Sequence, residues 1–266
     1  MGKNKLQKFA DMDSYDHVFQ ADYSQLCTAE NNANTTLPQQ LHFSMKGQWG
    51  EKFFGNNNPI VIELGCGKGE YTVGLAKLFP DKNFIGIDIK GARMHTGATQ
   101  AKQEGLHNVA FIRTRIEFIE AFFDKNEVSE IWITFPDPQM KKERKRLVGT
   151  LMLSRYRNFL QPNGFVHLKT DSPFLYQYTK AMLEANQIAS IVMLSDLYGS
   201  GFSDDILSIQ TYYESKWIEH GLTIKYFKFT LPPNQPLTEP DVDIEPDTYH
   251  MVGRGVQEKK QTNQRI

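Results

Sequence analysis

The sequence has few cysteines, no long apolar run and no excess of charge of either sign. Its 266 residues include two cysteines, Cys27 and Cys66, which lie far apart and outside any CxxC or Cys/His spacing. This pattern argues against a disulfide scaffold or a zinc site and suits a reducing, cytoplasmic environment. No run approaches the ~18 apolar residues of a membrane-spanning helix, and the N-terminus lacks the apolar core of a signal peptide. We therefore expect neither a metal nor a membrane partner.

The balance of charge limits how this chain can bind nucleic acid. Lys and Arg together number 30 and Asp and Glu 31, so the formal net charge is -1. Attraction to a polyanion through overall charge is excluded. Any such contact must come from basic residues that cluster locally.

Three regions of the chain differ in composition. Residues 1–40 are polar and rich in Asn, Gln and Asp, which predicts an N-terminal arm with at most short helices. Residues 232–266 open with PPNQP and carry EPDVDIEPD before a mildly basic end, which predicts an irregular C-terminal tail. Residues 41–231 alternate short β-rich runs with helical patterns, and we expect them to form one domain.

Seven apolar runs in this central region have the length and composition of β-strands. They are IVIEL (60–64), FIGIDI (84–89), VAFIRT (109–114), EIWITF (130–135), FVHLKT (165–170), IVMLS (191–195) and TIKYFKF (223–229). The segments between them have helical spacing. Strands that are apolar on both faces and alternate with helices predict an α/β fold, with a doubly wound, mostly parallel, seven-stranded sheet and helices on both faces.

IVIELGCGKGEYTVGLAKLF has the order strand, glycine loop, helix. Gly65, Gly67 and Gly69 allow the backbone to turn sharply and to approach a ligand, and the helix N-terminus adds free N–H groups. The next strand ends at Asp88, 23 residues after Gly65, where a carboxylate can accept both hydroxyls of a ribose. Loop and acid together fit NAD as well as S-adenosylmethionine.

Two details favour S-adenosylmethionine over NAD. The spacing is GxGxG and not GxGxxG, and Glu63 directly precedes Leu64 and Gly65. ExGxGxG resembles the first motif of class I S-adenosylmethionine methyltransferases, in which a carboxylate at this point faces the cationic, amine-bearing cofactor. The alternative, a glycine turn beside solvated acids, is disfavoured by the complete order of strand, loop, helix, strand and acid.

A second group of polar residues follows the next predicted strands. EIWITF runs into Pro136-Asp137-Pro138, and a proline on each side restricts the backbone that presents Asp137. The strand at 165–170 leads into Asp171. Both acids should lie beyond the C-terminal ends of neighbouring strands, where ligands bind in a doubly wound sheet. Alternatively, Asp171 serves only as the N-cap of the next helix.

Five basic residues in six follow the Asp137 loop: Lys141, Lys142, Arg144, Lys145 and Arg146. Such a run is often no more than a solvated helix face. Because it begins four residues after Asp137, it also suits a polyanion whose phosphates are held while one base reaches the cofactor. Further along, IQTYYESKW (209–217) offers Thr211, Glu214 and several aromatic rings, which more often belong to a core than to a stacking platform.

Together these motifs resemble the bacterial tRNA (guanine-N7)-methyltransferase family from about Leu37 to Leu231. The resemblance rests on IELGCGKGE, IDIK, FPDP with its basic run, LKTD and the TxxE of TYYE. It implies methyl transfer from S-adenosylmethionine to N7 of a guanine in the variable loop of tRNA, by a cytoplasmic monomer or homodimer. The implied residues are Asp137 for catalysis; Glu63, Gly65, Gly67, Gly69, Asp88, Arg115 and Asp137 for the cofactor; and Lys141, Asp171, Thr211, Tyr212, Tyr213 and Glu214 for the substrate.

Two positions depart from the pattern of that family. Many members carry Asp or Asn near the position of Arg115, whereas Arg cannot accept a hydrogen bond from the adenine amine. The backbone around Arg115 and Ile116, or a neighbouring residue, must then serve the adenine. Many members also have Trp where this chain has Gln139, which leaves less apolar support beneath the Asp137 loop.

Three other functions fit parts of the sequence. A class I methyltransferase with a different RNA, protein or small-molecule substrate is opposed by the FPDP-plus-basic segment and by TxxE. A catalytically idle RNA-binding protein on the same fold is opposed by the retention of Glu63, the three glycines, Asp88 and Asp137. A nicotinamide dehydrogenase is opposed by the loop spacing and by the basic run.

Overall fold

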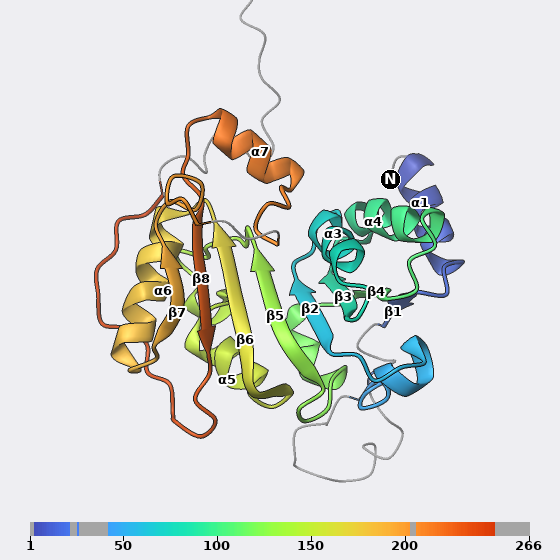
Figure 1. Ribbon diagram of the computed structural model, residues 1–266, viewed down its shortest axis with the longest axis horizontal. Helices are drawn as coiled ribbons and strands as arrows, with labels where there is room; N and C mark the ends of the chain where they lie inside the picture. Colours follow the sequence, from blue (N-terminus) through green and yellow to red (C-terminus); the bar gives the residue numbers. More distant parts are fainter. Residues whose placement is uncertain (1–2, 22–25, 27–41, 203–205, 248–266) are drawn as a thin grey trace, which may run out of the picture.

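The computed structural model describes residues 3–21, 26, 42–202 and 206–247. Its centre is an eight-stranded sheet with the order β1-β4-β3-β2-β5-β6-β8-β7 (Figure 1). Among the described strands, every pairing is parallel except the two that β8 makes with β6 and β7. The strands are β1 (Val18–Gln20), β2 (Ile60–Leu64), β3 (Asn83–Asp88), β4 (Val109–Arg113), β5 (Val128–Thr134), β6 (Leu160–Thr170), β7 (Ser190–Leu194) and β8 (Lys225–Thr230).

The predicted fold class is confirmed, and all seven predicted strands are present. The predicted number of strands is wrong, because β1 adds an eighth by pairing in parallel with β4, with Val18 opposite Phe111. Three residues in a polar segment are too few for an alternating apolar pattern to reveal a strand. The winding reverses at β2, which pairs with β3 on one side and with β5 on the other. Ligands bind at such a switch point.

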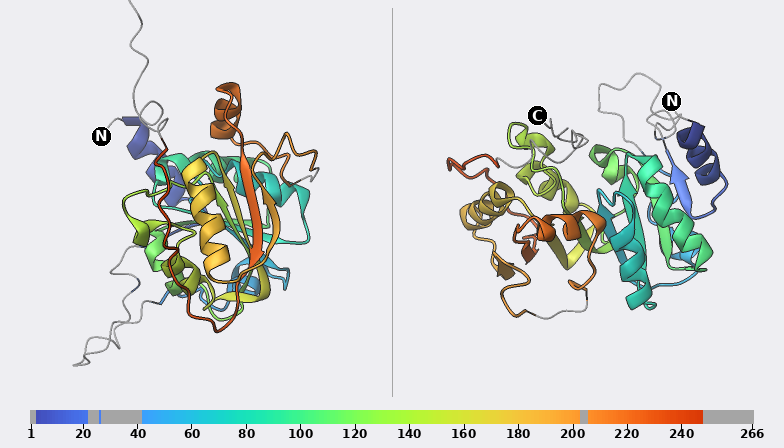
Figure 2. Two further views of the ribbon diagram at one scale, coloured as in Figure 1. Left: turned by 90° about the vertical axis from the view of Figure 1, so that its left-hand side faces the viewer. Right: turned by 90° about the horizontal axis from the view of Figure 1, so that it is seen from above.

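Helices cover both faces of the sheet (Figure 2). Alternate residues of β2 point to opposite faces, so that Ile60, Ile62 and Leu64 join one apolar cluster and Val61 joins the other. In the described residues, no helix is both long and apolar enough to cross a membrane. The helices are α1 (Lys3–Asp13), α3 (Glu70–Leu78), α4 (Gly91–Gln103), α5 (Thr150–Tyr156), α6 (Pro173–Ala185) and α7 (Tyr212–Glu219), with the shorter turns η2 (Trp49–Phe54), η3 (Ile116–Ala121) and η4 (Glu143–Lys145).

The two terminal regions both pack against this core. The N-terminal segment carries the 11-residue helix α1 in addition to β1, and its Met12 side chain is fully buried. This segment is therefore more regular than the arm we expected. The described part of the C-terminal tail, 232–247, contains no helix or strand, and it runs beside α6 (Figure 1). The division of the chain at residues 40 and 231 stays a prediction.

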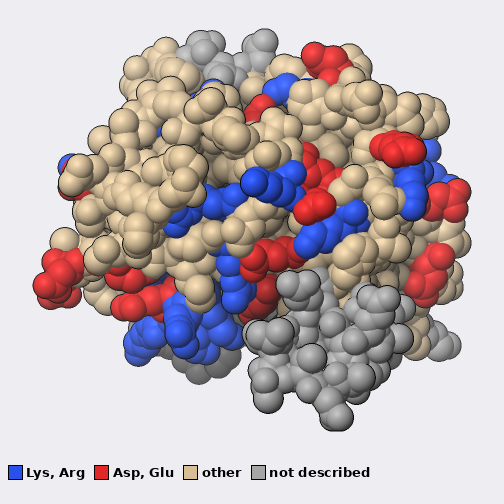
Figure 3. All heavy atoms as spheres, turned by 90° about the horizontal axis from the view of Figure 1, so that it is seen from below, with Lys and Arg blue, Asp and Glu red and all other residues tan. Residues whose placement is uncertain are grey.

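The surface charge is unevenly distributed although the formal net charge is -1. Seen from below, the molecule shows one dense group of Lys and Arg side chains at its lower left, whereas both signs mix over much of the remaining face (Figure 3). Overall charge is therefore a poor guide to what this surface can bind.

Candidate active site

The loop after β2 turns sharply at its three glycines. Gly65, Gly67 and Gly69 have φ angles of 77°, 57° and 75°, in the left-handed region that favours glycine. A Cβ atom on Gly65 would meet nothing within 4 Å, and one on Gly67 would meet only the Gly65 carbonyl oxygen at 3.9 Å. A Cβ on Gly69 would lie 2.8 Å from the Phe111 ring. Gly65 and Gly67 thus leave open space for a ligand, whereas Gly69 lets α3 begin close to β4.

Asp88, at the end of β3, binds the backbone of the glycine loop. Its Oδ2 accepts a hydrogen bond from the Gly67 N–H at 2.9 Å, and its Oδ1 accepts one from the Lys90 N–H at 2.7 Å. The residue is 9% exposed and lines a pocket. A carboxylate has about four lone-pair sites, so Asp88 can accept two further hydrogen bonds from a ribose. The geometry fits the role predicted for it.

Glu63 lies inside the protein and binds a residue that follows the glycine loop as well as a residue of β5, the strand that leads to Asp137. Its Oε2 accepts hydrogen bonds from the Thr72 N–H at 2.9 Å and the Thr72 hydroxyl at 2.5 Å, and its Oε1 accepts one from the Thr134 hydroxyl at 2.5 Å. Burial raises the pKa of Glu63 to about 7, although the hydrogen bonds from Thr134 and Thr72 act to lower it. The carboxylate thereby connects the end of β2 with the start of α3 and the end of β5.

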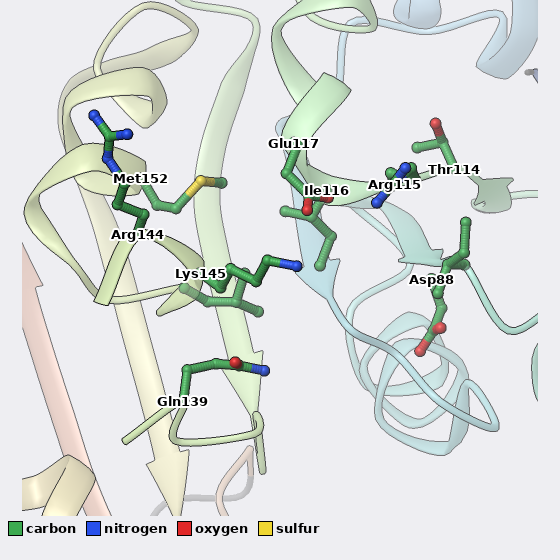
Figure 4. A pocket seen from close by; sticks show the side chains of 11 residues that line it. Asp88, Thr114, Arg115, Ile116, Glu117, Gln139, Arg144, Lys145 and Met152 are labelled. Carbon is green, nitrogen blue, oxygen red and sulfur yellow. The ribbon is translucent and has the colours of Figure 1, made fainter. Parts of the chain in front are cut away.

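A pocket of about 470 Å³ opens beside Asp88 (Figure 4). Its volume lies within the range of roughly 300–1,000 Å³ that is usual for small-molecule sites. The side chain of Lys145 extends from one wall toward Ile116 and Glu117 on the other (Figure 4). In the part of the chain that the structure describes, no three His, Cys, Asp or Glu residues are grouped so that they could hold a metal ion. One wall consists of Asp88, Ile89, Thr114, Arg115, Ile116 and Glu117, and the other of Gln139, Arg144, Lys145, Leu147 and Met152.

Arg115 lines the pocket with an exposed side chain. It precedes the 3₁₀ helix η3, and its own carbonyl oxygen accepts a hydrogen bond from the Phe118 N–H at 2.9 Å. The first N–H groups of a helix have no partner within that helix. The backbone at Ile116 therefore fits the alternative considered above, in which the main chain serves the adenine and the Arg115 side chain does not.

Sequence reasoning missed several residues of this pocket. Ile89 is 52% exposed and directly follows Asp88, so it presents an apolar surface where the ring of a ligand would lie. Its position directly after Asp88, the acid predicted to bind a ribose, was a usable signal. Met152 lies on α5, and only the tertiary structure brings it to the pocket. No local pattern identifies such a residue.

The loop after β5 presents Asp137 on the surface, between two residues with unusual backbone geometry. Asp137 is exposed, and its Oδ1 accepts a hydrogen bond from the Gln139 N–H at 3.0 Å. Phe135 and Gln139 both have a φ angle of 48°, which side chains of this size rarely adopt. Such conformations cost on the order of 1–3 kcal/mol each and cluster at functional sites. The departure from Trp at Gln139 thus falls on a residue that turns the loop.

The basic run after Asp137 divides into exposed and buried members. Arg146 is 4% exposed, and it donates hydrogen bonds from Nε to the Pro138 carbonyl at 3.3 Å and from Nη2 to the Met140 carbonyl at 3.0 Å. The expectation that the run as a whole meets a polyanion is therefore wrong for Arg146, because its donors face the protein. The exposed members are Lys141, Lys142, Arg144 and Lys145.

Asp171 follows the end of β6, which pairs with β5, but it is not the N-cap of α6. That cap is Ser172, whose Oγ accepts a hydrogen bond from the Leu175 N–H at 2.9 Å. Asp171 is 1% exposed, and its carbonyl oxygen accepts a hydrogen bond from Lys225 Nζ at 2.9 Å. The N-cap alternative is excluded, and contact with the substrate stays a prediction.

The TxxE segment forms a capping box at the start of α7. The Thr211 hydroxyl accepts a hydrogen bond from the Glu214 N–H at 3.2 Å, and Glu214 Oε2 accepts one from the Thr211 N–H at 3.3 Å. A Ser or Thr followed three residues later by Glu is the sequence signature of such a box, and this signal was missed. The side chains of Tyr212 and Tyr213 lie outside the described part of the structure, so their predicted contacts with substrate are not placed.

A buried ion pair holds α7 against the sheet. Lys169 Nζ lies 2.7 Å from Glu214 Oε1, and both side chains are fully buried. Lys169 also donates hydrogen bonds to the carbonyl oxygens of Leu207 and Ile209, each at 3.1 Å. Burial lowers the pKa of Lys169, and the Glu214 charge acts in the opposite direction. The pair fixes the segment that lies above the ends of β5 and β6 (Figure 1).

Comparison with known proteins places this chain in a family. Residues 57–227 match the family described as "Putative methyltransferase". Over 263 residues the chain is 57% identical to the tRNA (guanine-N(7)-)-methyltransferase of Bacteroides thetaiotaomicron, covering 99% of this chain and 100% of that protein. The chain belongs to the tRNA (guanine-N(7)-)-methyltransferase family. The member from Porphyromonas gingivalis is 54% identical over 245 residues, covering 91% of this chain and 96% of that one.

Solved structures resemble this family member in fold. The 16S rRNA methyltransferase KamB superposes with a TM-score of 0.54 at 13% identity, covering 74% of this chain and 97% of that one. The 16S rRNA (adenine(1408)-N(1))-methyltransferase from Catenulisporales acidiphilia gives a TM-score of 0.51 at 15% identity, with coverages of 72% and 96%. At these identities the likeness concerns the fold alone, and it agrees with the doubly wound sheet described above.

Proposed function

We propose that this chain transfers the methyl group of S-adenosylmethionine to N7 of a guanine in tRNA and forms 7-methylguanosine. The observation that supports this most strongly is the pocket, which joins Asp88 to Gln139, Arg144 and Lys145 of the segment after Asp137. The relatives that carry the name of this reaction match nearly the whole chain. A guanine of the variable loop is the proposed target, because FPDP, LKTD and TxxE resemble the family motifs.

On the cofactor side, S-adenosylmethionine would lie along the glycine loop. S-adenosylmethionine supplies an electrophilic methyl group on a positively charged sulfur. Asp88 has lone pairs left for the two ribose hydroxyls, and Ile89 offers apolar surface to the adenine. The pKa of the buried Glu63 is about 7, and a bound cation favours its charged form. S-adenosylhomocysteine is the product that follows.

On the substrate side, Asp137 would stabilise charge and not remove a proton. Guanine N7 carries an in-plane lone pair, so methyl transfer to it requires no general base. Positive charge develops on the purine as the new bond forms, and a fixed carboxylate beside the base lowers the energy of that state. The exposure of Asp137 leaves room for a base to approach, and the Gln139 N–H holds its carboxylate in place.

The exposed basic residues would position the tRNA. Lys141, Lys142 and Lys145 follow Asp137 by four to eight residues, and their side chains are exposed. Contacts to phosphates fix position without reading sequence, which suits a group that brings one base to a nearby pocket. A tRNA substrate also implies that the enzyme works in the cytoplasm.

Incubation with labelled S-adenosylmethionine and an unmodified tRNA transcript tests this function. We expect label in 7-methylguanosine, at a single position of the variable loop. A matched transcript with adenosine at that position should accept no label. Label in any other nucleoside would favour a different methyltransferase. Failure of the protein to bind S-adenosylmethionine would favour an RNA-binding protein without catalysis.

A further inference from the structure

Arg146 is a buried cation whose surroundings are carbonyl groups and aromatic rings. Its guanidinium carbon lies 4.3 Å from the centre of the Tyr178 ring and 5.0 Å from that of Phe174, both on α6. Burying a cation costs free energy unless such partners replace its water. Arg146 is 4% exposed, so an incoming phosphate cannot reach it without a rearrangement. The residue therefore has a different task from the exposed basic residues before it.

Both carbonyl groups that Arg146 binds belong to the Asp137 loop. They are those of Pro138 and Met140, at 3.3 and 3.0 Å, and they flank Gln139. Gln139 is the residue with a φ angle of 48° whose N–H binds the Asp137 carboxylate. One planar guanidinium thus fixes the peptide group that precedes the left-handed residue and the peptide group that follows Met140. Lysine has the charge but lacks the fork of donors that spans two carbonyls.

Glu239 of the C-terminal tail binds Tyr178, one of the two aromatic residues that pack against Arg146. The Tyr178 hydroxyl donates a hydrogen bond to Glu239 Oε2 at 2.6 Å. Glu239 Oε1 accepts hydrogen bonds from the Thr150 hydroxyl at 2.5 Å and from the Thr150 N–H at 3.2 Å, at the start of α5. The tail thereby ties the ring that stacks on Arg146 to the helix that follows the basic run.

A second contact of the tail lies at the start of α6. The Asp247 carboxylate accepts hydrogen bonds from the Ser172 hydroxyl and from the Phe174 N–H, the latter at 2.9 Å. The Asp247 N–H donates to the Met140 sulfur at 3.2 Å. A carboxylate at a helix N-terminus is stabilising there. The tail therefore contacts the Asp137 loop directly as well as through Arg146.

We propose that Arg146 is a positioning residue that holds the Asp137 loop in its working geometry, and that Glu239 of the C-terminal tail keeps Arg146 in place through Tyr178. The inference rests on the proposed function for its kinetic consequence and on the contacts above for its structural one. It gives the tail a role in the active site, although the tail carries no residue of the predicted catalytic or binding set.

Arg146→Lys and Arg146→Met test the proposal with two readouts on the full-length protein. At saturating tRNA and cofactor, we expect the single-turnover rate of Arg146→Lys to fall roughly 10²-fold, the scale on which misplacement of a reacting group acts. For Arg146→Met, which removes the charge, we expect the slope of log Kd for tRNA against log salt to stay as in the wild type. Lys142→Ala is the matched comparison, since loss of one phosphate contact should lower that slope by about 1.

Tyr178→Phe is a milder variant that keeps the ring under Arg146 and removes only the hydroxyl that binds Glu239. We expect its rate to fall about 2–10-fold, as for the loss of one hydrogen bond. The rate of Glu239→Gln should fall by a similar factor if the tail acts through this hydroxyl. Both variants keep the test decisive if Arg146→Lys folds poorly.

Hydrogen exchange separates this proposal from the proposed function. The backbone amides of residues 139–142 should exchange faster in Arg146→Lys and Tyr178→Phe, while those of β2 and β3 stay protected as in the wild type. This result is expected whichever nucleic acid is methylated. Unchanged exchange in the loop would overturn the proposal. A lowered salt slope with a wild-type rate in Arg146→Met would overturn it as well, and would return Arg146 to the phosphate-binding group.

Discussion

The two halves of the site are built by contacts of different range. In the cofactor half, the Gly67 N–H binds Asp88 across 21 positions of the chain, and the Thr72 N–H binds Glu63 across nine. In the substrate half, Tyr178 binds Glu239 across 61 positions, and Lys169 binds the Ile209 carbonyl across 40. The contacts of the glycine loop and Asp88 thus lie within one strand-loop-helix-strand unit, although Thr134 also binds Glu63 across 71 positions. The second half depends more on segments that only the complete fold brings together.

This difference explains why some residues that were predicted to contact a ligand bind partners within the protein instead. In the substrate half, Arg146 and Glu214 looked like ligand contacts because they stand in a basic run and in TxxE. Both are buried, and both bind partners within the protein. Where the contacting residues are close in sequence, their spacing predicts the geometry of the contact. Where the partner lies far along the chain, the sequence gives only the type of the residue.

The largest effect on stability is expected for Glu214→Ala. This change leaves the Lys169 cation buried without its carboxylate partner, which should lower the free energy of unfolding by about 3–5 kcal/mol. Thr211→Ala is the control, because it removes only the hydroxyl of the cap and should cost about 1 kcal/mol. Urea denaturation of both variants at one pH measures the difference. Equal losses would show that the ion pair adds nothing beyond the cap.

Glu63→Gln should change how stability depends on pH. The pKa of Glu63 is raised from 4.5 to about 7, so between these values the folded state binds more protons than the unfolded one. The free energy of unfolding therefore falls as pH rises through this window, by about 3 kcal/mol from this group alone, at about 1.4 kcal/mol for each unit of pKa. The glutamine variant should lack this part of the fall.

Chemical denaturation at pH 5 and pH 8 checks the expectation for Glu63. Glu117→Gln is the matched control, since Glu117 also lines the pocket but is exposed. It should keep the wild-type dependence. If Glu63→Gln kept that dependence too, the buried carboxylate would not be the group that titrates.

The smallest effect is expected for the joint replacement of Lys141, Lys142 and Lys145 by Ala. These side chains are exposed, so the free energy of unfolding should change little. Binding of tRNA should weaken, and the salt slope should fall by up to about 3 because each lost phosphate contact removes about 1. Lys180→Ala, on the exposed face of α6, is the control and should leave the slope unchanged. An unaltered slope in the triple variant would make the run a solvated surface.

The sequence predicted most of the fold because its signals there are local. Each of the seven predicted strands lies within a few residues of its observed position, and the glycine loop and Asp88 meet as their spacing implied. β1 was missed because a strand of only three residues in a polar segment is too short to show a period-two pattern. The burial of Arg146 was missed because Tyr178 and Glu239, which account for it, follow 32 and 93 residues later. Separation along the sequence, and not residue type, distinguishes what could be predicted from what could not.

In the proposed mechanism, Asp137 stabilises charge on the base and takes little part in holding the cofactor. Single-turnover methyl transfer to tRNA by Asp137→Asn, with the Kd for S-adenosylmethionine measured on the same protein, tests it most directly. We expect a rate lowered about 10²–10³-fold, as for loss of one preorganised electrostatic group, with the cofactor Kd close to that of the wild type. An unchanged rate, or a loss of rate that saturating cofactor restores, would contradict it.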